Sequence, residues 1–211
     1  MRRPTRPRAS GRRKGDERSR NATPDCRTLG QILGVALPDK PRIAWCGDPL
    51  RARELADFFA ANVGSAPEYI SHSELQGPRA LSPEVWRPGL SEILLQEIEP
   101  RLVATDQRRR GNISQPIAVA EEDGRLVAVS LVTFAGNAPA VPFAIVEDLV
   151  VDRSRRSRGI GKAVMDWVVA EALARNIRRI FLESSHSNER AHRFFKREGF
   201  RTCSIVMMRD I

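Results

Sequence analysis

The stretch at residues 146–162 (VEDLVVDRSRRSRGIGK) constrains the fold of this chain most strongly. It begins with aliphatic and β-branched residues, which are typical of a β-strand. A polar, arginine-rich loop follows and contains Gly159 and Gly161. Apolar residues then recur at helical spacing, at Val164, Met165, Val168, Val169, Ala172 and Leu173. The sequence therefore predicts a strand, a glycine turn and a helix whose first main-chain N–H groups lack helical partners.

A glycine turn of this kind favours the binding of a phosphate. The unpaired N–H groups and the helix dipole attract an anion, and glycine has no Cβ to keep a phosphate away from the main chain. A Walker loop is excluded because Lys162 is followed by Ala163 rather than Ser or Thr. The dinucleotide fingerprint is excluded because Val164 stands where it needs a third glycine. The remaining pattern is R-x-x-G-x-G from Arg156, for which a tight turn without a ligand is the alternative.

A second motif follows the predicted helix. A strand is expected at residues 179–184 (RIFLES), and a further helix is expected from Ser187-Asn188 to the glycine at 199. Together the two motifs resemble those of the GNAT superfamily of N-acetyltransferases. The residues that carry the second part of the resemblance are Glu183, Asn188, Phe195 and Gly199-Phe200. The resemblance covers about the last 70 residues strongly and roughly the last 170 in pattern.

The resemblance implies that acetyl-CoA is the cosubstrate. Main-chain N–H groups of the loop would hold the pyrophosphate. Arg155, Arg158 and Lys162 would add positive charge near it, with solvated side chains as the alternative. The strands on either side of the glycine helix would be parallel and splay apart, so that the free edge of the first pairs with the pantetheine arm. A strand N–H would bind the oxyanion. The expected cofactor-binding residues are Leu149, Val150, Val151, Arg156, Ser157, Arg158, Gly159, Ile160, Gly161, Lys162, Asn188 and Phe195.

Two glutamates are candidates for the catalytic base, and both are expected on strands that flank the cleft. Glu183 matches the position of the proton acceptor in the ribosomal-protein N-terminal acetyltransferases. Glu147 lies on the central strand, where other members of the family place a carboxylate. A solvated or salt-bridged strand residue is the alternative for each. Asp148 is expected to point to the opposite face, because side chains alternate along a strand.

The acid that protonates the leaving thiolate is missing from its usual place. Proteins with this pattern usually have a tyrosine where this chain has Phe195, and phenylalanine has no proton to donate. The proton would then come from water or from another side chain, and the candidates are Ser184, Ser185, His186 and Cys203. The substitution also supports an alternative function, an acyl-CoA-binding module with little or no transferase activity.

The remaining sequence predicts an α/β (α+β) architecture, the GNAT fold, with a mixed central β-sheet and helices on both faces. One domain is expected over residues 40–211. Its other elements are strands at 42–46, 116–121 and 125–134, helices at 48–64 and 89–100, and a last strand at 201–211 that would bury Cys203. The hairpin turn is expected at Asp123-Gly124. Since only one strand fits after residue 200, the acceptor side would be open or closed by a partner chain, as in a homodimer.

Residues 1–39 are expected to form a disordered basic tail, because they offer few apolar residues to offset the entropy lost on ordering. Residues 1–20 carry eight arginines and one lysine against two acidic residues, so most of the formal net charge of +9 belongs to them. The remaining 191 residues are nearly neutral. No aromatic residues are interleaved with the arginines for base stacking, so a solvated extension is expected and nucleic acid is an unexpected partner. A tether to nucleic acid or another acidic surface is the alternative.

The acceptor is expected to be a small-molecule or peptide amine whose identity the sequence does not specify. Residues 64–88 are predicted to be irregular and to form much of the acceptor wall. Candidate contacts there are Tyr69, His72, Glu74 and Trp86, with ordinary surface positions as the alternative. No apolar run is long enough to span a membrane. The three histidines and three cysteines lack metal-ligand spacing, so no metal is expected, and a cytoplasmic location is the default.

Overall fold

A computed structural model of the chain describes residues 40–69, 79–82, 84–107, 113–136, 141–205, 207 and 209. The chain divides into two units, Met1–Asp39 and Lys40–Ile211, and the fold described below is that of the second. The predicted disordered tail lies outside the described residues.

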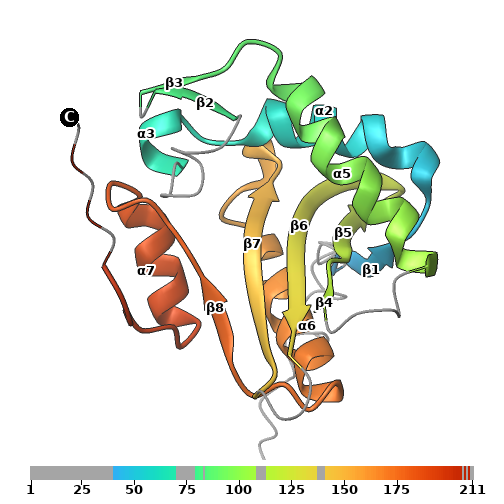
Figure 1. The fold of residues 1–211 in the computed structure, drawn as a ribbon, viewed down its shortest axis with the longest axis vertical. Coiled ribbons are helices and arrows are strands. Elements are labelled where there is room, and N and C mark those ends of the chain that lie inside the picture. Colours follow the sequence, from blue (N-terminus) through green and yellow to red (C-terminus); the bar gives the residue numbers. More distant parts are fainter. Residues whose placement is uncertain are drawn as a thin grey trace, which may run out of the picture. The chain divides into compact units, whose positions relative to one another are not determined.

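A mixed β-sheet forms the centre of the second unit (Figure 1). Over the described residues it contains six strands in the order β1-β5-β6-β7-β8, with the short β4 paired to β6. Their bounds are β1 Arg42–Cys46, β4 Ile113–Ser114, β5 Ile117–Glu122, β6 Arg125–Ala135, β7 Phe143–Val151 and β8 Ile180–Leu182. Strands β7 and β8 are parallel and the other pairs are antiparallel, which confirms the predicted mixed sheet. The β5–β6 turn has positive φ at Asp123 and Gly124, as a two-residue hairpin turn requires.

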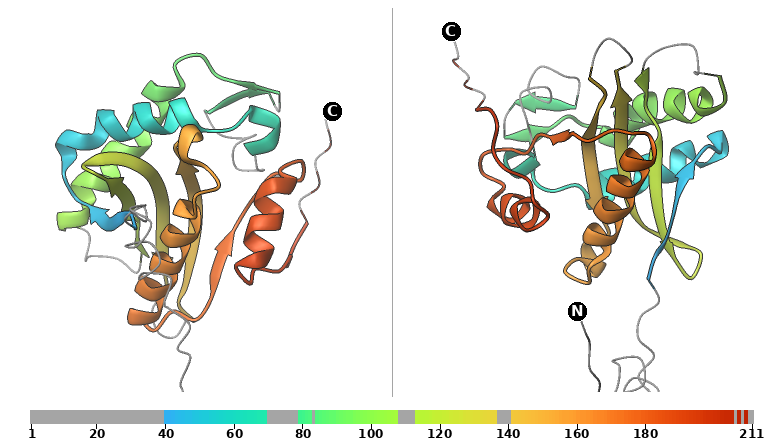
Figure 2. Two further views of the ribbon diagram at one scale, coloured as in Figure 1. Left: turned by 180° about the vertical axis from the view of Figure 1, so that it is seen from behind. Right: turned by 90° about the horizontal axis from the view of Figure 1, so that it is seen from below.

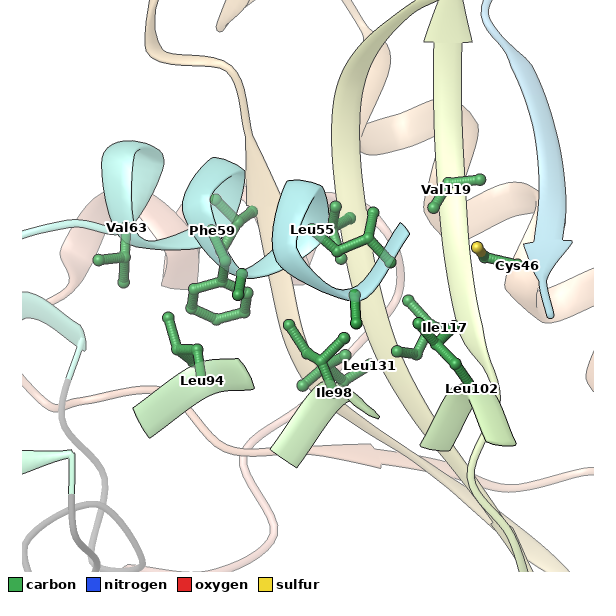
Figure 3. Packing of buried hydrophobic residues seen from close by; sticks show 14 residues of the cluster. Cys46, Leu55, Phe59, Val63, Leu94, Ile98, Leu102, Ile117, Val119 and Leu131 are labelled. Atoms are coloured by element: carbon green, nitrogen blue, oxygen red, sulfur yellow. The ribbon is translucent and has the colours of Figure 1, made fainter. Parts of the chain in front are cut away.

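Helices cover both faces of the sheet, as Figure 2 shows. Helices α2 (Ala52–Asn62) and α5 (Leu90–Gln107) lie on one face, and α6 (Ile160–Ala174) lies on the other. Buried apolar side chains form one core cluster between α2, α5 and the sheet (Figure 3). In it, Leu55 and Phe59 of α2 and Leu94 and Ile98 of α5 pack over apolar side chains of the strands. Each of these four side chains is at most 1% exposed. Full burial of such a side chain stabilises the fold by about 1.5–3 kcal/mol.

The second cluster joins α6 to the sheet and to α7 (Glu189–Arg197). Ile160, Val164 and Val168 of α6 are buried in it, and Phe194 and Phe195 of α7 pack against it. The periodicity of these apolar residues is the reason that both segments form helices where the sequence predicts them.

Three sequence predictions about extent are wrong. Residues 64–88 are not wholly irregular, since they contain α3 (Ala66–Tyr69), β2 (Ala80–Ser82) and β3 (Val85–Trp86). Helix α5 does not end at Pro100 but runs on to Gln107. Its packing against α2 and the sheet, through Leu102 among others, overrides the local cost of the proline.

The predicted final strand is the third error. Residues 201–205, 207 and 209, the described part of that segment, form no strand, and 201–205 are exposed. Cys203 is therefore exposed rather than a core residue. The outer edge of β8, where a final strand could have paired, therefore has no partner over the described residues.

None of the described helices is long and apolar enough to cross a membrane. The described residues also contain no cluster of three or more metal-ligating side chains.

Candidate active site

The loop between β7 and α6 has a main chain fixed by its own residues. Asp152 caps the 3₁₀ turn η2 (Arg153–Arg155), and its carboxylate accepts a hydrogen bond of 2.8 Å from the N–H of Ser154. Ser157 and Gly159 have φ of +66° and +83°. Gly159 is the N-cap of α6 and provides no side-chain cap, so the first N–H groups of α6 are not capped by its side chain. A Cβ at Gly159 would meet no atom within 4 Å, so the space in front of this helix end is open.

Three arginines surround a pocket of about 600 Å³ beside this loop. The pocket is lined by Gly64, Ser65, Glu68, Arg153, Arg156, Ser157 and Arg190. In the part of the chain that the structure describes, none of the three arginines forms an ion pair. The lining therefore carries three positive charges against the single carboxylate of Glu68, with no ion pair among them in the described structure.

Neutral oxygen atoms hold these guanidinium groups in place. Arg153 donates to the carbonyl of Val63, and Arg156 donates to the carbonyl of Asn62. Both carbonyls lie at the C-terminal end of α2, where the helix dipole is negative. From α7, Arg190 donates to the hydroxyl of Ser157 over 3.0 Å.

The arginines repel one another across the pocket. Burial lowers the pKa of the Arg156 guanidinium, and the positive charges of Arg153 and Arg190 lower this pKa further. An anion bound between them would relieve that repulsion. The arrangement is suited to a ligand that carries phosphate groups.

The three basic residues expected beside the pyrophosphate are not among those that line the pocket. Arg155 pairs with Glu122 of β5. Lys162 forms ion pairs with Asp166 at 2.8 Å and with Glu198 at 3.1 Å, so its charge is balanced by α6 and by the end of α7. Arg158 is exposed. A Cβ at Gly161 would lie 3.7 Å from Phe194 and Val151, which is ordinary contact.

Strands β7 and β8 pair over three residues only. Ala144, Ile145 and Val146 pair with β8, and beyond them the two strands diverge (Figure 1). Along residues 147–151 the edge of β7 that faces β8 therefore has no strand partner among the described residues. The expected splay is present. Ser184, just beyond β8, has a buried hydroxyl with no hydrogen-bond partner in the described structure.

A β-bulge at Glu147 changes the direction of the side chains that follow. One residue of β6 pairs with Val146 and the preceding residue of β6 pairs with Asp148, so Glu147 has no partner of its own. Val146 belongs to the cluster under α6. Glu147 and Asp148, by contrast, both bind arginines on the α5 side of the sheet. The prediction that Asp148 points to the opposite face is wrong, because the extra residue interrupts the alternation.

Arginines pair with both carboxylates. Glu147 accepts hydrogen bonds from Arg101 of α5 and from the Thr133 hydroxyl of β6. The carboxylate of Asp148 lies 3.3 Å from Arg79, which also pairs with Glu97 of α5.

Tyr69 extends this network into α3. Its hydroxyl donates a hydrogen bond to Asp148, and its ring contacts those of Phe59 and Trp86 at 6.1 and 5.8 Å between centroids. Tyr69 and Trp86, expected at the acceptor wall, thus lie together on the α5 side of β7. His72 and Glu74 lie outside the described residues.

The far end of α3 is bonded to the segment after β8. The carbonyl oxygen of Pro67 accepts hydrogen bonds from the hydroxyls of Ser185, at 2.7 Å, and Ser187. Helix α3 is therefore attached to β7 through Tyr69 and to the β8–α7 segment through Pro67. It crosses the gap between the two strands at the end where they have separated.

The remaining predicted residues lie around α7 and the end of β8. Glu183 is exposed and follows β8 rather than lying within it, because the strand ends at Leu182. Asn188 caps α7 and accepts from the N–H of Ala191 at 3.1 Å. Phe195 packs in an aromatic cluster, 5.0 Å from Phe194 and 5.8 Å from the ring at position 200.

Several arginines of the site could not be predicted from the sequence. Arg153, Arg190, Arg79 and Arg101 are common surface residues in the sequence, and no spacing distinguishes them from the chain's other arginines. Their partners are distant in the sequence, so only the tertiary structure brings them to the pocket or the β-bulge.

No curated protein sequence matches this chain significantly, whereas many solved structures share its fold. Among solved structures, the tetramutant of the BH1408 protein from Bacillus halodurans is 20% identical, with a TM-score of 0.58 over 81% of this chain and 99% of that one. A ribosomal-protein-alanine N-acetyltransferase from Brucella melitensis biovar Abortus 2308 is 17% identical, with a TM-score of 0.53 and the same coverage.

A third similar structure is the aminoglycoside N-acetyltransferase AAC(6')-Iy in complex with CoA. It is 13% identical, with a TM-score of 0.53 over 83% of this chain and 99% of that one. At such identities the likeness shows a shared fold. The family assignment comes from the sequence, because the model of the Acetyltransferase (GNAT) family matches residues 89–200, more than half of the chain. The chain belongs to the GNAT family of acetyltransferases.

Proposed function

We propose that this protein is an acetyl-CoA-dependent N-acetyltransferase that acts on a primary amine of a small molecule or peptide in the cytoplasm. The observation that carries the proposal is the pocket with three arginines outside any described ion pair, beside the open N-terminus of α6. A diphosphate suits this combination, because main-chain N–H groups and guanidinium groups both bind phosphate oxygens.

The residues of the cleft fit the rest of coenzyme A as well. Main-chain N–H groups of residues 157–162 would hold the diphosphate, together with Arg156 and its neighbours. The unpaired edge at residues 149–151 would pair with the amide groups of the pantetheine as an added strand. The hydroxyl of Ser184, which has no partner among the described residues, and the side-chain amide nitrogen of Asn188, whose oxygen caps α7, are proposed as further donors.

Glu147 is the proposed base. Arg101 and Thr133 hold its carboxylate, and its side chain keeps 27% of its surface exposed, so that an amine or an intervening water can reach it. The amine attacks the thioester carbonyl, Glu147 takes the proton from the nitrogen, and a main-chain N–H of the open β7 edge stabilises the oxyanion. Glu183, the other candidate, is exposed beyond β8 and would act through water.

We propose an amine as the acceptor because proteins of similar structure are named as acetyltransferases of amines. One is a ribosomal-protein-alanine N-acetyltransferase, and another is an aminoglycoside acetyltransferase in complex with sisomicin. These acceptors differ in size and charge, so they define the chemistry of the acceptor rather than its identity.

Calorimetry and a thiol-release assay test the proposal. Wild-type protein should bind CoA with measurable heat. It should also release thiol from acetyl-CoA with at least one amine of a panel: sisomicin, spermidine and a peptide that begins with alanine. Absence of heat from folded protein would overturn the proposal. CoA binding without transfer to any amine would favour the alternative, an acyl-CoA-binding module, which the phenylalanine at position 195 supports.

A matched pair of variants on α7 tests the role of the pocket. Arg190→Gln removes a pocket guanidinium, whereas Arg193→Gln removes the same charge from an ion pair with Glu189 at 3.1 Å. Hydrogen bonds to charged groups contribute about 1.5–3 kcal/mol, so Arg190→Gln should weaken CoA binding roughly tenfold or more. Arg193→Gln should change it by less than about twofold. If the two variants weaken CoA binding equally, the phosphates do not bind at this pocket.

A further inference from the structure

We propose that Tyr69 donates the proton that the leaving thiolate of coenzyme A requires, and that Asp148 orients its hydroxyl. The inference rests on the proposed acetyl transfer. In that reaction the carbon–sulfur bond breaks and the electron pair goes to sulfur. A thiolate that remains unprotonated can attack the new amide or the thioester again, so a nearby proton donor favours product formation.

Tyr69 is a proton donor that this chain can place at the cleft. It is the single tyrosine in the sequence. Its hydroxyl hydrogen is directed to Asp148, the residue next to the proposed base Glu147 in β7. The β-bulge brings both carboxylates to the same side of the sheet, so Tyr69 and Glu147 act on the same face of β7.

The position of α3 places this hydroxyl where the strands separate. The last β7 residue paired with β8 is Val146, and Asp148 lies two residues beyond it. The carbonyl of Pro67 is bonded to Ser185 and Ser187 on the other side of the gap. Tyr69 is thus held in a helix that spans the gap, beside the open edge that would carry the pantetheine arm and its thioester.

The neighbours of Tyr69 support proton donation. Its ring is fixed by Phe59 and Trp86. Asp148 holds the hydroxyl until rotation about the C–O bond turns the hydrogen from the carboxylate to the more basic thiolate. The guanidinium of Arg79, which lies 3.3 Å from Asp148 and also pairs with Glu97, offsets part of the carboxylate charge that the forming phenolate would meet.

The protons balance over one turnover. The amine nitrogen forms a bond to the carbonyl carbon and loses a proton to Glu147. The carbon–sulfur bond breaks, and the sulfur takes the proton of the Tyr69 hydroxyl. Glu147 then releases its proton to water and Tyr69 regains one from water, so the net change is one proton moved from nitrogen to sulfur.

The donors expected near the second motif are less suitable. The Ser185 hydroxyl donates to Pro67, and His186 and Cys203 are exposed. Phe195 has no exchangeable proton and packs against Phe194. Ser184 is the competing donor, because its buried hydroxyl has no partner among the described residues.

Leaving-group basicity distinguishes a proton donor from a structural residue. Wild type, Tyr69→Phe and Ser184→Ala are compared with acetyl-CoA and with the acetyl selenoester of the selenol analogue of CoA, using the amine of the panel that reacts fastest. A selenolate is a much weaker base than a thiolate and leaves without a proton. General acid catalysis contributes roughly 10²–10⁴-fold, so Tyr69→Phe should lower kcat about 100-fold or more with the thioester and far less with the selenoester.

Other outcomes are equally informative. Tyr69→Phe keeps the ring contacts, so its CoA affinity should stay within about twofold of wild type. An equal loss of kcat with both substrates would show that Tyr69 is only structural and would overturn the inference. A loss confined to the thioester in Ser184→Ala, and absent in Tyr69→Phe, would overturn it in favour of Ser184. If wild type transfers acetyl from neither substrate, the proposed function itself fails.

Discussion

Arg156, in the loop before α6, donates a hydrogen bond to the main-chain carbonyl of Asn62, the last residue of α2. The Asn62 side chain accepts a hydrogen bond of 2.9 Å from the N–H of Arg153 in the same loop. The end of α2 and the loop therefore hold each other in place. The geometry of the proposed phosphate site is set before a ligand arrives, which reduces the entropy lost on binding.

Replacing Asn62 should loosen this attachment. Asn62→Ala removes the acceptor for Arg153 and the donor that binds the Phe58 carbonyl at 2.9 Å. We expect a loss of about 1–2 kcal/mol in the free energy of unfolding, measured by urea denaturation, and a several-fold weaker CoA affinity by calorimetry. Asn62→Gln keeps an amide oxygen without adding charge and is the control for affinity. Unchanged CoA binding by the alanine variant would mean that the loop holds its shape without α2.

The two loop glycines should respond differently to alanine. Gly159 has φ of +83°, where an L-residue costs roughly 1–2 kcal/mol, so Gly159→Ala should lower stability and weaken CoA binding. Gly161 lies in the first turn of α6, and its Cβ would make ordinary contacts at 3.7 Å. Gly161→Ala should therefore be neutral or stabilise the fold by up to about 1 kcal/mol. Thermal unfolding of both variants, with and without CoA, checks the contrast, which an equal destabilisation would contradict.

The buried pair of Arg79 and Asp148 should be costly to break. Both side chains are less than 10% exposed, so Arg79→Met leaves the Asp148 carboxylate buried without this cation. Removal of one partner of a buried ion pair typically costs about 3–5 kcal/mol. The double variant Arg79→Met/Asp148→Asn should recover part of that loss in urea denaturation. A cost below about 1 kcal/mol for Arg79→Met would show that water reaches the carboxylate.

Glu171 should make stability depend on acidic pH. The hydrogen bond from Arg175, at 2.7 Å, and then that from Trp45, at 2.8 Å, lower the pKa of this carboxyl. Its stabilising contribution is present above the unfolded-state pKa of about 4.3 and is lost as the pH falls through the lower folded-state pKa. Glu171→Gln should be less stable than wild type at pH 7, by up to about 1 kcal/mol, and the difference should shrink as the pH falls through the lowered folded-state pKa. A stability difference of the same size at pH 7 and at acidic pH, measured by thermal unfolding, would contradict this prediction.

The parts of the fold encoded in short stretches could be predicted from the sequence. The strand, loop and helix at residues 143–174 follow from apolar periodicity and from two glycines, all of which are local signals. The cap of α7 by Asn188 and the positive φ of Gly199 are local in the same way.

Features that depend on distant residues could not be predicted. The bulge at Glu147 arises from pairing with β6, so strand alternation alone gave the wrong direction for Asp148. The ion pairs of Lys162 depend in part on Glu198, thirty-six positions further along the chain. The segment after residue 200 is long enough for one strand, but its described residues do not pair with the sheet and Cys203 is exposed.

The short contact between β7 and β8 has a consequence for handling the protein. Unpaired strand edges are places where a second chain can add by main-chain hydrogen bonding, and this is a common start of aggregation. The edge of β7 beyond Val146 is of this kind, and a pantetheine arm lying along it would occupy the same N–H and C=O groups. Coenzyme A should therefore act as a solubilising additive, and concentrated protein should scatter less light in its presence than in its absence.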